Sequence, residues 1–351
     1  MAEQSNKISY ITGIKTVCIL LVCLWHCVLF YVDEPFFSEN FNSPSPGATF
    51  VGNVFDVTLM ASFVFCAGFV YARSLECHNR SIPQRIWERI KRLIIPYYII
   101  GALWLVPLYT LFDIKVYGRP DGAGLAEGYV HMALGQFSDH LWFLWMLFWV
   151  ALFFILFSFL FRKNLKILLL VITIAAAVCV KLFLYDFPYF KLSQIAPYLI
   201  CYYAGMFCYG IRDRLEQLSA GVRLTLAGVL FAAVIAHAIF LPSHFLWLYI
   251  ARLCGALFFF FLFMYLEETQ IWKCVTGTAV YDWIARHQLE MYSLHMPLPY
   301  LFARILRPYI GGIPILCILI NCALVLLCGM MIVQIYIRIR SCITRLLGQE
   351  Q

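Results

Sequence analysis

The feature that most constrains the fold is a series of apolar runs, each of about 20 residues, that recur along the 351-residue chain. An α-helix needs roughly 20 such residues to cross the hydrocarbon core of a bilayer. Hydrophobic residues make up 63% of the chain and charged residues 13%, whereas soluble proteins contain about 25% charged residues. These values exclude a soluble globular enzyme, a disordered chain and a conventional nucleic-acid-binding protein. They predict an all-α integral membrane protein.

A hydropathy window of about 20 residues predicts ten transmembrane helices. The ninth is unusually polar, because Arg286, Glu290 and His295 fall inside it, and such a span is expected to face protein or water. No internal repeat or low-complexity linker divides the chain, so we expect a single membrane domain over 1–351 without an appended soluble domain. The predicted spans are residues 9–31, 51–72, 93–112, 140–161, 165–185, 194–211, 222–241, 245–266, 284–304 and 312–337.

Lysine and arginine are unequally distributed between the two sets of loops. With the N-terminus inside, 18 of the 26 fall in cytoplasmic segments and 5 in the opposite loops. Positively charged residues accumulate in cytoplasmic loops, so both termini are predicted to be cytoplasmic. The net charge of +7 therefore reflects membrane orientation first, and does not by itself indicate an acidic partner.

The 14 cysteines lie mostly in apolar runs and include no CxxC pair. We expect them to pack as small buried hydrophobic side chains, with neither a disulfide framework nor a metal site.

Lys15 and His26 are ionisable residues inside the first predicted span. They are eleven residues apart, which places both side chains within ~20° on one helix face and ~16 Å apart along the axis. Lys15 has two interpretations: its ammonium reaches the headgroup region, or it binds an anionic ligand near the inner surface. His26 is either hydrogen-bonded to a carbonyl or acts as a base deeper in the same line.

His140 opens the fourth predicted span. Ser138 or Asp139 is expected to cap that helix and to place His140 in the first turn at the outer surface. There His140 is either an interfacial residue beside the following tryptophans or a functional group.

The ninth span contains Glu290, Tyr292 and His295. Glu290 and His295 are ~140° apart around a helix, so they need not touch. Pro297 and Pro299 are expected to break the helix just beyond His295 and to free carbonyl groups, as in a cavity lining.

Two further groups of polar residues lie in or near the spans. Arg252 and Asp56 lie at similar predicted depth on the outer side and are expected to pair. His237 and His244 are expected to be interfacial.

Several chemistries lack their motifs: the chain has no Gly-rich phosphate loop, no HExxH and no G-x-S-x-G. Because no serine or cysteine nucleophile motif is present, His26 is the best candidate for a general base.

These residues, in order and spacing, resemble the motifs of the integral-membrane acyltransferase 3 family of bacterial O-acyltransferases. Three positions depart from the family pattern: Thr12 replaces an acidic residue, Lys15 the commoner arginine, and Ala67 a serine. Lysine keeps the charge but lacks the planar fork for bidentate phosphate binding. The similar segments are residues 12–26, 63–69, 89–98, 140–144, 197–206 and 289–295.

The resemblance implies an O-acetyltransferase of the bacterial inner membrane that moves an acyl group, here expected to be acetyl, from cytoplasmic acyl-CoA to a hydroxyl of a cell-surface or lipid-linked glycan. It implies no bound cofactor, and acyl-CoA, glycan and lipid as partners. The implied roles are general base for His26; acceptor orientation or oxyanion stabilisation for His140 and His295; donor binding for Lys15, Arg89 and Arg92; and polar support from Glu290, Tyr292, Arg252 and Asp56.

Two alternative functions remain open at this point. A broken ninth helix with buried charges also fits a transporter, although no inverted repeat is visible. A non-catalytic partner in polysaccharide export is the second alternative, favoured by the departures at Lys15 and Ala67.

Overall fold

A computed structural model describes residues 8–33, 44–114, 124–136, 140–240 and 245–346. This part of the chain contains helices and no strand, as predicted. The elements are α1 (Ser9–Val28), η1 (Leu29–Tyr31), α2 (Pro46–Cys77), α3 (Ile82–Arg89), η2 (Ile90–Ile94), α4 (Ile95–Ile100), η3 (Gly101–Leu105), α5 (Val106–Leu111), α6 (Leu125–Ala133), α7 (Trp142–Leu156), α8 (Ser158–Arg162), α9 (Lys166–Phe183), η4 (Leu192–Gln194), α10 (Ala196–Gly210), α11 (Arg212–Glu216), α12 (Ala220–Phe240), α13 (Phe245–Leu266), α14 (Gln270–Thr276), α15 (Ala279–Arg286), α16 (Gln288–Leu294), α17 (Leu298–Ile310) and α18 (Pro314–Leu346).

Seven helices of the described residues are long and apolar enough to cross a membrane. The α7 helix is apolar but shorter, and the ninth predicted span is divided among the end of α15, α16 and the start of α17. The protein is therefore an all-α membrane protein, while the exact count of ten spans stays a prediction. The seven are Ser9–Tyr31, Pro46–Cys77, Ile82–Leu111, Lys166–Phe183, Ala220–Phe240, Leu246–Leu266 and Pro314–Cys342.

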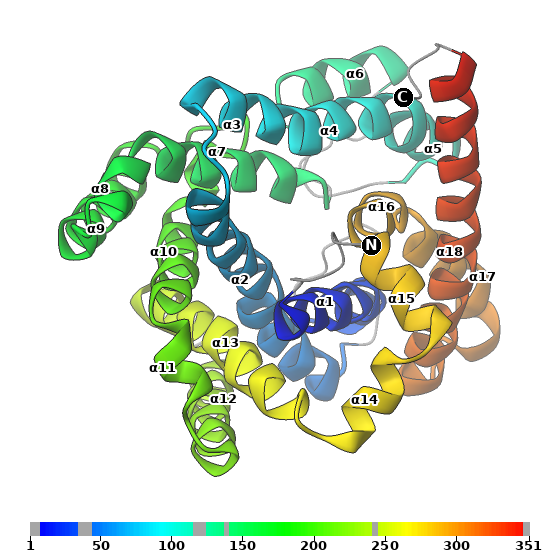
Figure 1. Cartoon of the computed structure of the whole chain (residues 1–351). Helices are drawn as coiled ribbons and strands as arrows, with labels where there is room; N and C mark the ends of the chain where they lie inside the picture. The colour runs from blue at the N-terminus through cyan, green and yellow to red at the C-terminus, as the bar shows by residue number, and fades with distance from the viewer. Residues whose placement is uncertain (1–7, 34–43, 115–123, 137–139, 241–244, 347–351) are drawn as a thin grey trace.

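The helices α1 and α2 form the centre of the bundle (Figure 1). The most apolar window of α1 is 67% buried and that of α2 is 72%, against 22% for α9 and 28% for α18. In a membrane protein, peripheral helices expose apolar side chains to lipid, so the inner helices are the ones that hold polar groups. His26 of α1 is thus in the protein interior.

The α2 and α10 helices pack backbone against backbone at two glycines. A Cβ atom at Gly68 would overlap the carbonyl oxygen of Tyr202, and one at Gly205 would overlap that of Phe65. Small residues at such contacts let membrane helices approach closely. This contact fixes the position of α2 against α10.

The ninth predicted span is broken where the prolines predict. The α16 helix ends at Leu294, and α17 begins at Leu298 after a cis Met296–Pro297 bond. The third span is also irregular, because π-helical turns at η2 and η3 precede Pro96 and Pro107. Proline lacks an amide hydrogen and clashes with the preceding turn, so the helix widens there.

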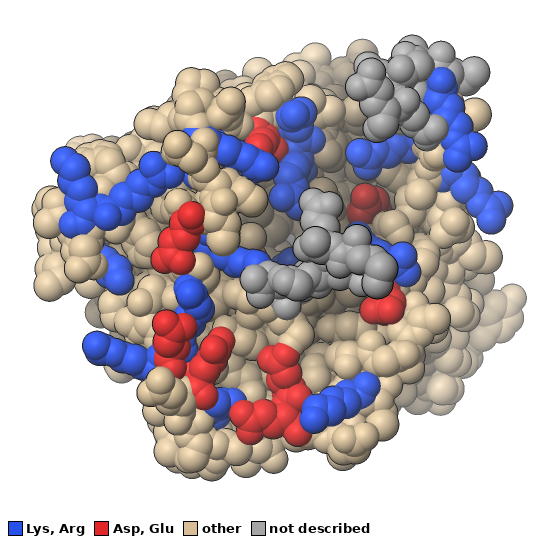
Figure 2. All heavy atoms as spheres, in the orientation of Figure 1, with Lys and Arg blue, Asp and Glu red and all other residues tan. Residues whose placement is uncertain are grey.

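Lysine and arginine side chains gather on the face of the molecule shown in Figure 2, over the ends of α2, α3, α8, α11, α14 and α18. We refer to this side as the basic face. It contains the segments that the charge count assigns to the cytoplasm, and that assignment remains a prediction.

Candidate active site

Three histidines from distant parts of the chain meet inside the bundle. The ring centroids of His26 and His295 are 4.8 Å apart, as are those of His140 and His295, and His26 and His140 are 6.4 Å apart. All three are buried, with exposed fractions of 4%, 2% and 1% for His26, His140 and His295. The end of α1, the residues before α7 and the end of α16 each contribute one ring. We call these residues the histidine cluster.

Hydrogen bonds to carbonyl groups determine the tautomers of two of the rings. His26 Nδ1 lies 2.8 Å from the oxygen of Val22, and His295 Nδ1 lies 2.7 Å from that of Tyr292. A carbonyl only accepts hydrogen bonds, so both Nδ1 atoms donate and Nε2 keeps the lone pair in each neutral ring. His295 Nε2 also lies 3.3 Å from His26 Nδ1. It therefore accepts from the same N–H and orients the His26 ring.

Tyr292 and Ser293 of α16 bond His140. The Tyr292 hydroxyl donates a hydrogen bond to the backbone oxygen of His140, and His140 Nε2 donates to the oxygen of Ser293, 3.1 Å away. The Tyr292 ring also contacts the His140 ring, with centroids 5.4 Å apart. The segment before α7 is thus tied to α16 by reciprocal bonds.

The prediction that His140 lies at the outer surface in the first turn of a capped helix is wrong. The α7 helix begins at Trp142, and its N-cap residue, Leu141, makes no side-chain cap bond. The proposed caps Ser138 and Asp139 lie outside the described residues. His140 turns into the bundle because its ring and its backbone both bond to α16.

A cavity of about 200 Å³ extends from the basic side towards this cluster. Lys15, Arg89 and Arg92, the three predicted donor-binding residues, all line it. Its α2 wall is formed by residues 63, 66, 67 and 70, which share one helix face. At the other end, the Phe143 ring lies 6.0 Å from that of Phe63 and 5.6 Å from that of Tyr292. The cavity therefore has cations at one end and aromatic rings beside the histidines at the other.

A second, wider cavity of about 510 Å³ adjoins the first and shares Lys15, Arg92, Gln288 and Leu289 with it. Glu290, a predicted supporting residue, lines this wider part and lies 3.9 Å from a guanidinium nitrogen of Arg340. The basic residues of its lining are Lys15, Lys91, Arg92, Arg286 and Arg340. We call this part the basic mouth, because five cations face one carboxylate there.

Gln288 was not among the predicted residues, although it lines both cavities. Its amide nitrogen donates to Thr16 Oγ1, 2.7 Å away, and faces the backbone oxygen of Thr12 at 3.4 Å. The only signal in the sequence is its position one helical turn before Tyr292, which places it on the same face of α16.

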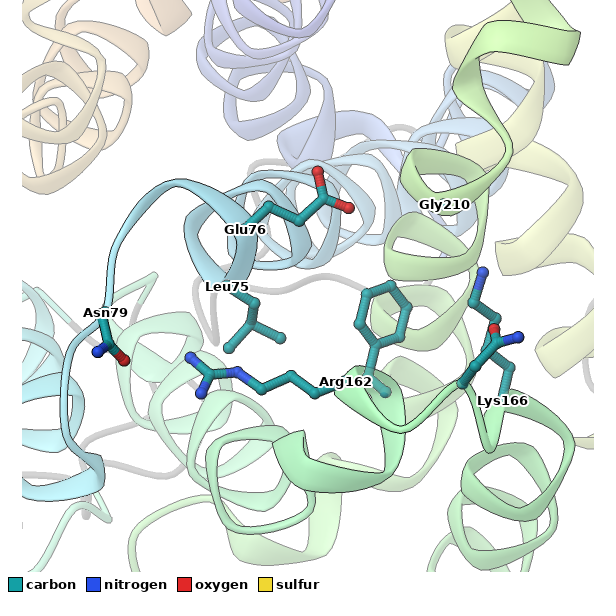
Figure 3. Close-up of a pocket in the computed structure, with 8 residues that line it drawn as sticks. Leu75, Glu76, Asn79, Arg162, Lys166 and Gly210 are labelled. Carbon is teal, nitrogen blue, oxygen red and sulfur yellow. The ribbon is translucent and has the colours of Figure 1, made fainter.

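A further cavity of about 520 Å³ opens beside the ends of α2 and α10 (Figure 3). Arg162 and Lys166 line it with Glu76 and two asparagines. None of the predicted site residues lines it, so it is separate from the histidine cluster.

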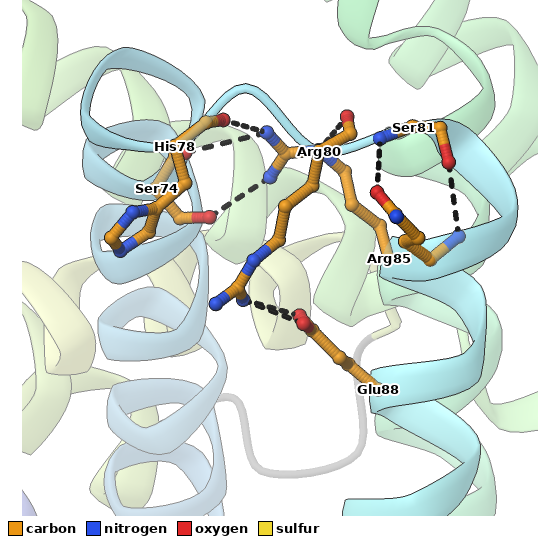
Figure 4. A network of polar contacts seen from close by, with 7 residues as sticks. Ser74, His78, Arg80, Ser81, Arg85 and Glu88 are labelled. Atoms are coloured by element: carbon orange, nitrogen blue, oxygen red, sulfur yellow. Dashed lines mark hydrogen bonds and ion pairs between the residues drawn. The ribbon is translucent and has the colours of Figure 1, made fainter.

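Polar contacts between the end of α2 and the start of α3 fix the turn that joins the two helices (Figure 4). The Arg85 guanidinium donates to Ser74 Oγ at 2.9 Å and to the oxygen of His78 at 2.7 Å. Arg80 pairs with Glu88 at 2.7 Å. Arg80 and Arg85 therefore bond other residues at this turn. Arg89 and Arg92, further along the chain, line the cavity of about 200 Å³.

Asp56 and Arg252 form the expected ion pair, with 3.3 Å between Asp56 Oδ2 and Arg252 Nη2. His237, expected to be interfacial, is buried in the protein with an exposed fraction of 5%. It lies one helical turn from Val234, which packs against Val57 and Ala251, the neighbours of Asp56 and Arg252. His244 lies outside the described residues.

The described residues contain no group of three or more His, Cys, Asp or Glu side chains that could hold a metal ion. All 14 cysteines are free, and most of them are buried. The expectation that cysteines act as small packing residues is confirmed for the buried ones.

The fold defines an all-α membrane protein in which a histidine cluster lies beside a cation-lined cavity. Residues 8–334 match the family model of the acyltransferase domain, Acyl_transf_3. The match covers nearly the whole chain, and the protein therefore belongs to this acyltransferase family. Searches of curated proteins and of solved structures returned no match.

Proposed function

We propose that this protein is an O-acetyltransferase of the bacterial inner membrane, which moves an acetyl group from cytoplasmic acetyl-CoA to a hydroxyl of a cell-surface or lipid-linked glycan. The basic face is then cytoplasmic, with both termini on that side, and the donor enters through the basic mouth. The protein needs no bound cofactor for this reaction, because the thioester supplies the activated acyl group.

The observation that carries this proposal is a cavity that begins with cations and ends at Tyr292, whose ring contacts the histidine cluster. Lys15, Arg89 and Arg92 suit the phosphates of CoA, and the apolar cavity walls suit the pantetheine arm. Tyr292 lines the inner end of the cavity and its ring contacts His140. In this proposal the thioester carbonyl reaches the cluster past the Tyr292 ring.

His26 is the proposed general base. Its Nδ1–H is held by the oxygen of Val22 and by His295, which leaves Nε2 as the basic atom. Nε2 takes the proton of the acceptor hydroxyl as that oxygen attacks the thioester carbonyl. When the tetrahedral intermediate collapses, the C–S bond breaks and the proton passes to the CoA thiolate.

The tautomers favour positioning over oxyanion stabilisation as the role of the other two histidines. His295 Nδ1–H donates to the backbone oxygen of Tyr292, and His140 Nε2–H donates to the backbone oxygen of Ser293. In each neutral ring the single N–H is therefore bonded to the protein and does not point at substrate. His295 instead orients the base, as the third group orients the base in a catalytic triad.

The test is release of CoA by the purified protein, measured with a thiol reagent, in the presence and absence of envelope glycan from the producing cells. An acetyltransferase releases CoA when the glycan is present and leaves alkali-labile acetyl groups on it. A transporter moves glycan across a proteoliposome membrane without CoA release, and a non-catalytic export partner does neither. Either result would contradict the proposal.

A further inference from the structure

A second polar cluster lies on the far side of the aromatic rings from the basic face. It contains Asp56 of α2, Arg252 of α13 and Tyr198 of α10. His237 of α12 lies near it, because Val234, one turn away, packs against Val57 and Ala251. Asp56 precedes Phe63 by seven residues, which is about 10 Å along the helix axis, away from the end of α2 at the basic face. These helices therefore bring polar side chains together in their halves opposite the basic face.

The Asp56 side chain is unusual for a membrane-spanning helix. It is 46% exposed, whereas its partner Arg252 is only 13% exposed. A half-exposed carboxylate within a span is unfavourable unless water or a polar ligand meets it. The Arg252 Nε and His237 Nδ1 atoms are also buried and have no hydrogen-bond partner among the described residues. Such atoms are normally satisfied by a protein group, water or ligand.

Aromatic rings connect this cluster to the candidate active site. The Arg252 guanidinium lies 4.9 Å from the centroid of the Tyr198 ring, and that ring lies 6.1 Å from Trp142. Trp142 contacts Phe143, 6.1 Å away, and follows His140 by two residues. A line of contacts thus runs from Arg252 through Tyr198 to Trp142, two residues from His140.

We propose that Asp56, Arg252, Tyr198 and Trp142 form the binding site for a sugar ring of the acceptor. This inference rests on the proposed function, since it identifies where the hydroxyl-bearing substrate is held. The paired charges disfavour a ligand with a strong charge of either sign. Sugar hydroxyls donate to the Asp56 carboxylate and accept from Arg252, and the apolar face of the sugar packs on the half-buried Trp142. Tyr198 is buried beneath the Arg252 guanidinium and positions it.

The competing role for this pair is structural, as an ion pair that fastens α2 to α13. The chain offers a matched control in Arg223 and Glu268, which pair at 2.5 Å with side-chain exposures of 8% and 53%. This pair also involves α12 and the end of α13, but at the basic face. A structural role predicts similar effects when either pair is broken.

The experiment measures the KM for envelope glycan and the KM for acetyl-CoA separately, together with the thermal midpoint in detergent. We expect Asp56→Asn and Arg252→Gln to raise the glycan KM about 10- to 100-fold, since each removes a hydrogen bond to a charged group. The acetyl-CoA KM should stay within about twofold, because the donor cavity lies on the other side of the aromatic rings. Glu268→Gln should leave both KM values unchanged.

The reversed pair, Asp56→Arg with Arg252→Asp, separates the two roles further. It restores an ion pair between α2 and α13, so a structural role predicts recovery of both thermal midpoint and glycan KM. Recovery of the glycan KM in this variant, or unchanged glycan KM in both single variants, would overturn the inference. Direct binding of the soluble glycan, followed by Trp142 fluorescence against Trp142→Phe, provides a readout without turnover. If the wild type binds glycan but releases no CoA, the proposed function fails while the acceptor site stands.

Discussion

Removing the His26 ring tests the proposed chemistry most directly. His26→Gln keeps a polar side chain at the end of α1 but lacks the basic nitrogen, and His26→Ala removes the hydrogen bond to Val22. General base catalysis contributes ~10²–10⁴-fold, so we expect the rate of acetyl transfer to fall by that factor. Loss of a buried hydrogen-bond partner for His295 costs about 1–3 kcal/mol of stability. The thermal midpoint therefore has to be measured for each variant.

The contact between His26 and His295 makes the test sharper, because the two residues are expected to act as a unit. If His295 works only by orienting His26, His295→Ala costs less than His26→Ala, and the double variant costs no more than His26→Ala alone. The assay is CoA release with saturating glycan, and also acetyl-CoA hydrolysis without glycan. His131→Ala is the control, since His131 bonds Gln136 in the region of α6, away from the cluster. A loss below tenfold for a stable His26→Ala protein, or additive losses in the double variant, would refute the assignment.

Three other predictions concern the donor cavity, the helix packing and a buried lysine. Lys15→Met should weaken CoA binding by about tenfold, while Lys15→Arg should retain it. CoA affinity is measured by titration, and equal affinities in the wild type and Lys15→Met would show that the Lys15 ammonium only reaches the headgroups. Gly205→Ala should lower the free energy of unfolding by about 1–3 kcal/mol or more, because the added Cβ overlaps α2. Gly221→Ala, whose Cβ meets open space, should not destabilise the protein, and equal thermal midpoints for the two variants would contradict the packing argument. Burial lowers the pKa of Lys191 to about 8, so the unfolded chain binds more protons than the folded chain between pH 8 and about 10.5, and stability should rise with pH there. Unfolding midpoints measured across this window should rise less steeply in Lys191→Met. Parallel curves would show that Lys191 does not contribute to the pH dependence.

The sequence by itself was sufficient for features that depend on neighbouring residues. Hydropathy locates the apolar helices, because each must satisfy its own backbone hydrogen bonds in lipid. Helical periodicity predicts that Lys15 and His26 share a face, and the prolines predict the break after His295. The order of the motifs was sufficient to indicate the acyltransferase family, to which the chain belongs.

The tertiary structure alone decided which polar groups meet. His26 and His295 are separated by 269 residues, and His140 and Ser293 by 153, so no local pattern predicts their contacts. His140 was expected at the surface because hydropathy only locates the start of the span, and it cannot show that His140 bonds α16 inside the bundle. The tautomers and the position of Gln288 likewise depend on which carbonyl or hydroxyl lies opposite each side chain. Those partners exist only once the helices have packed.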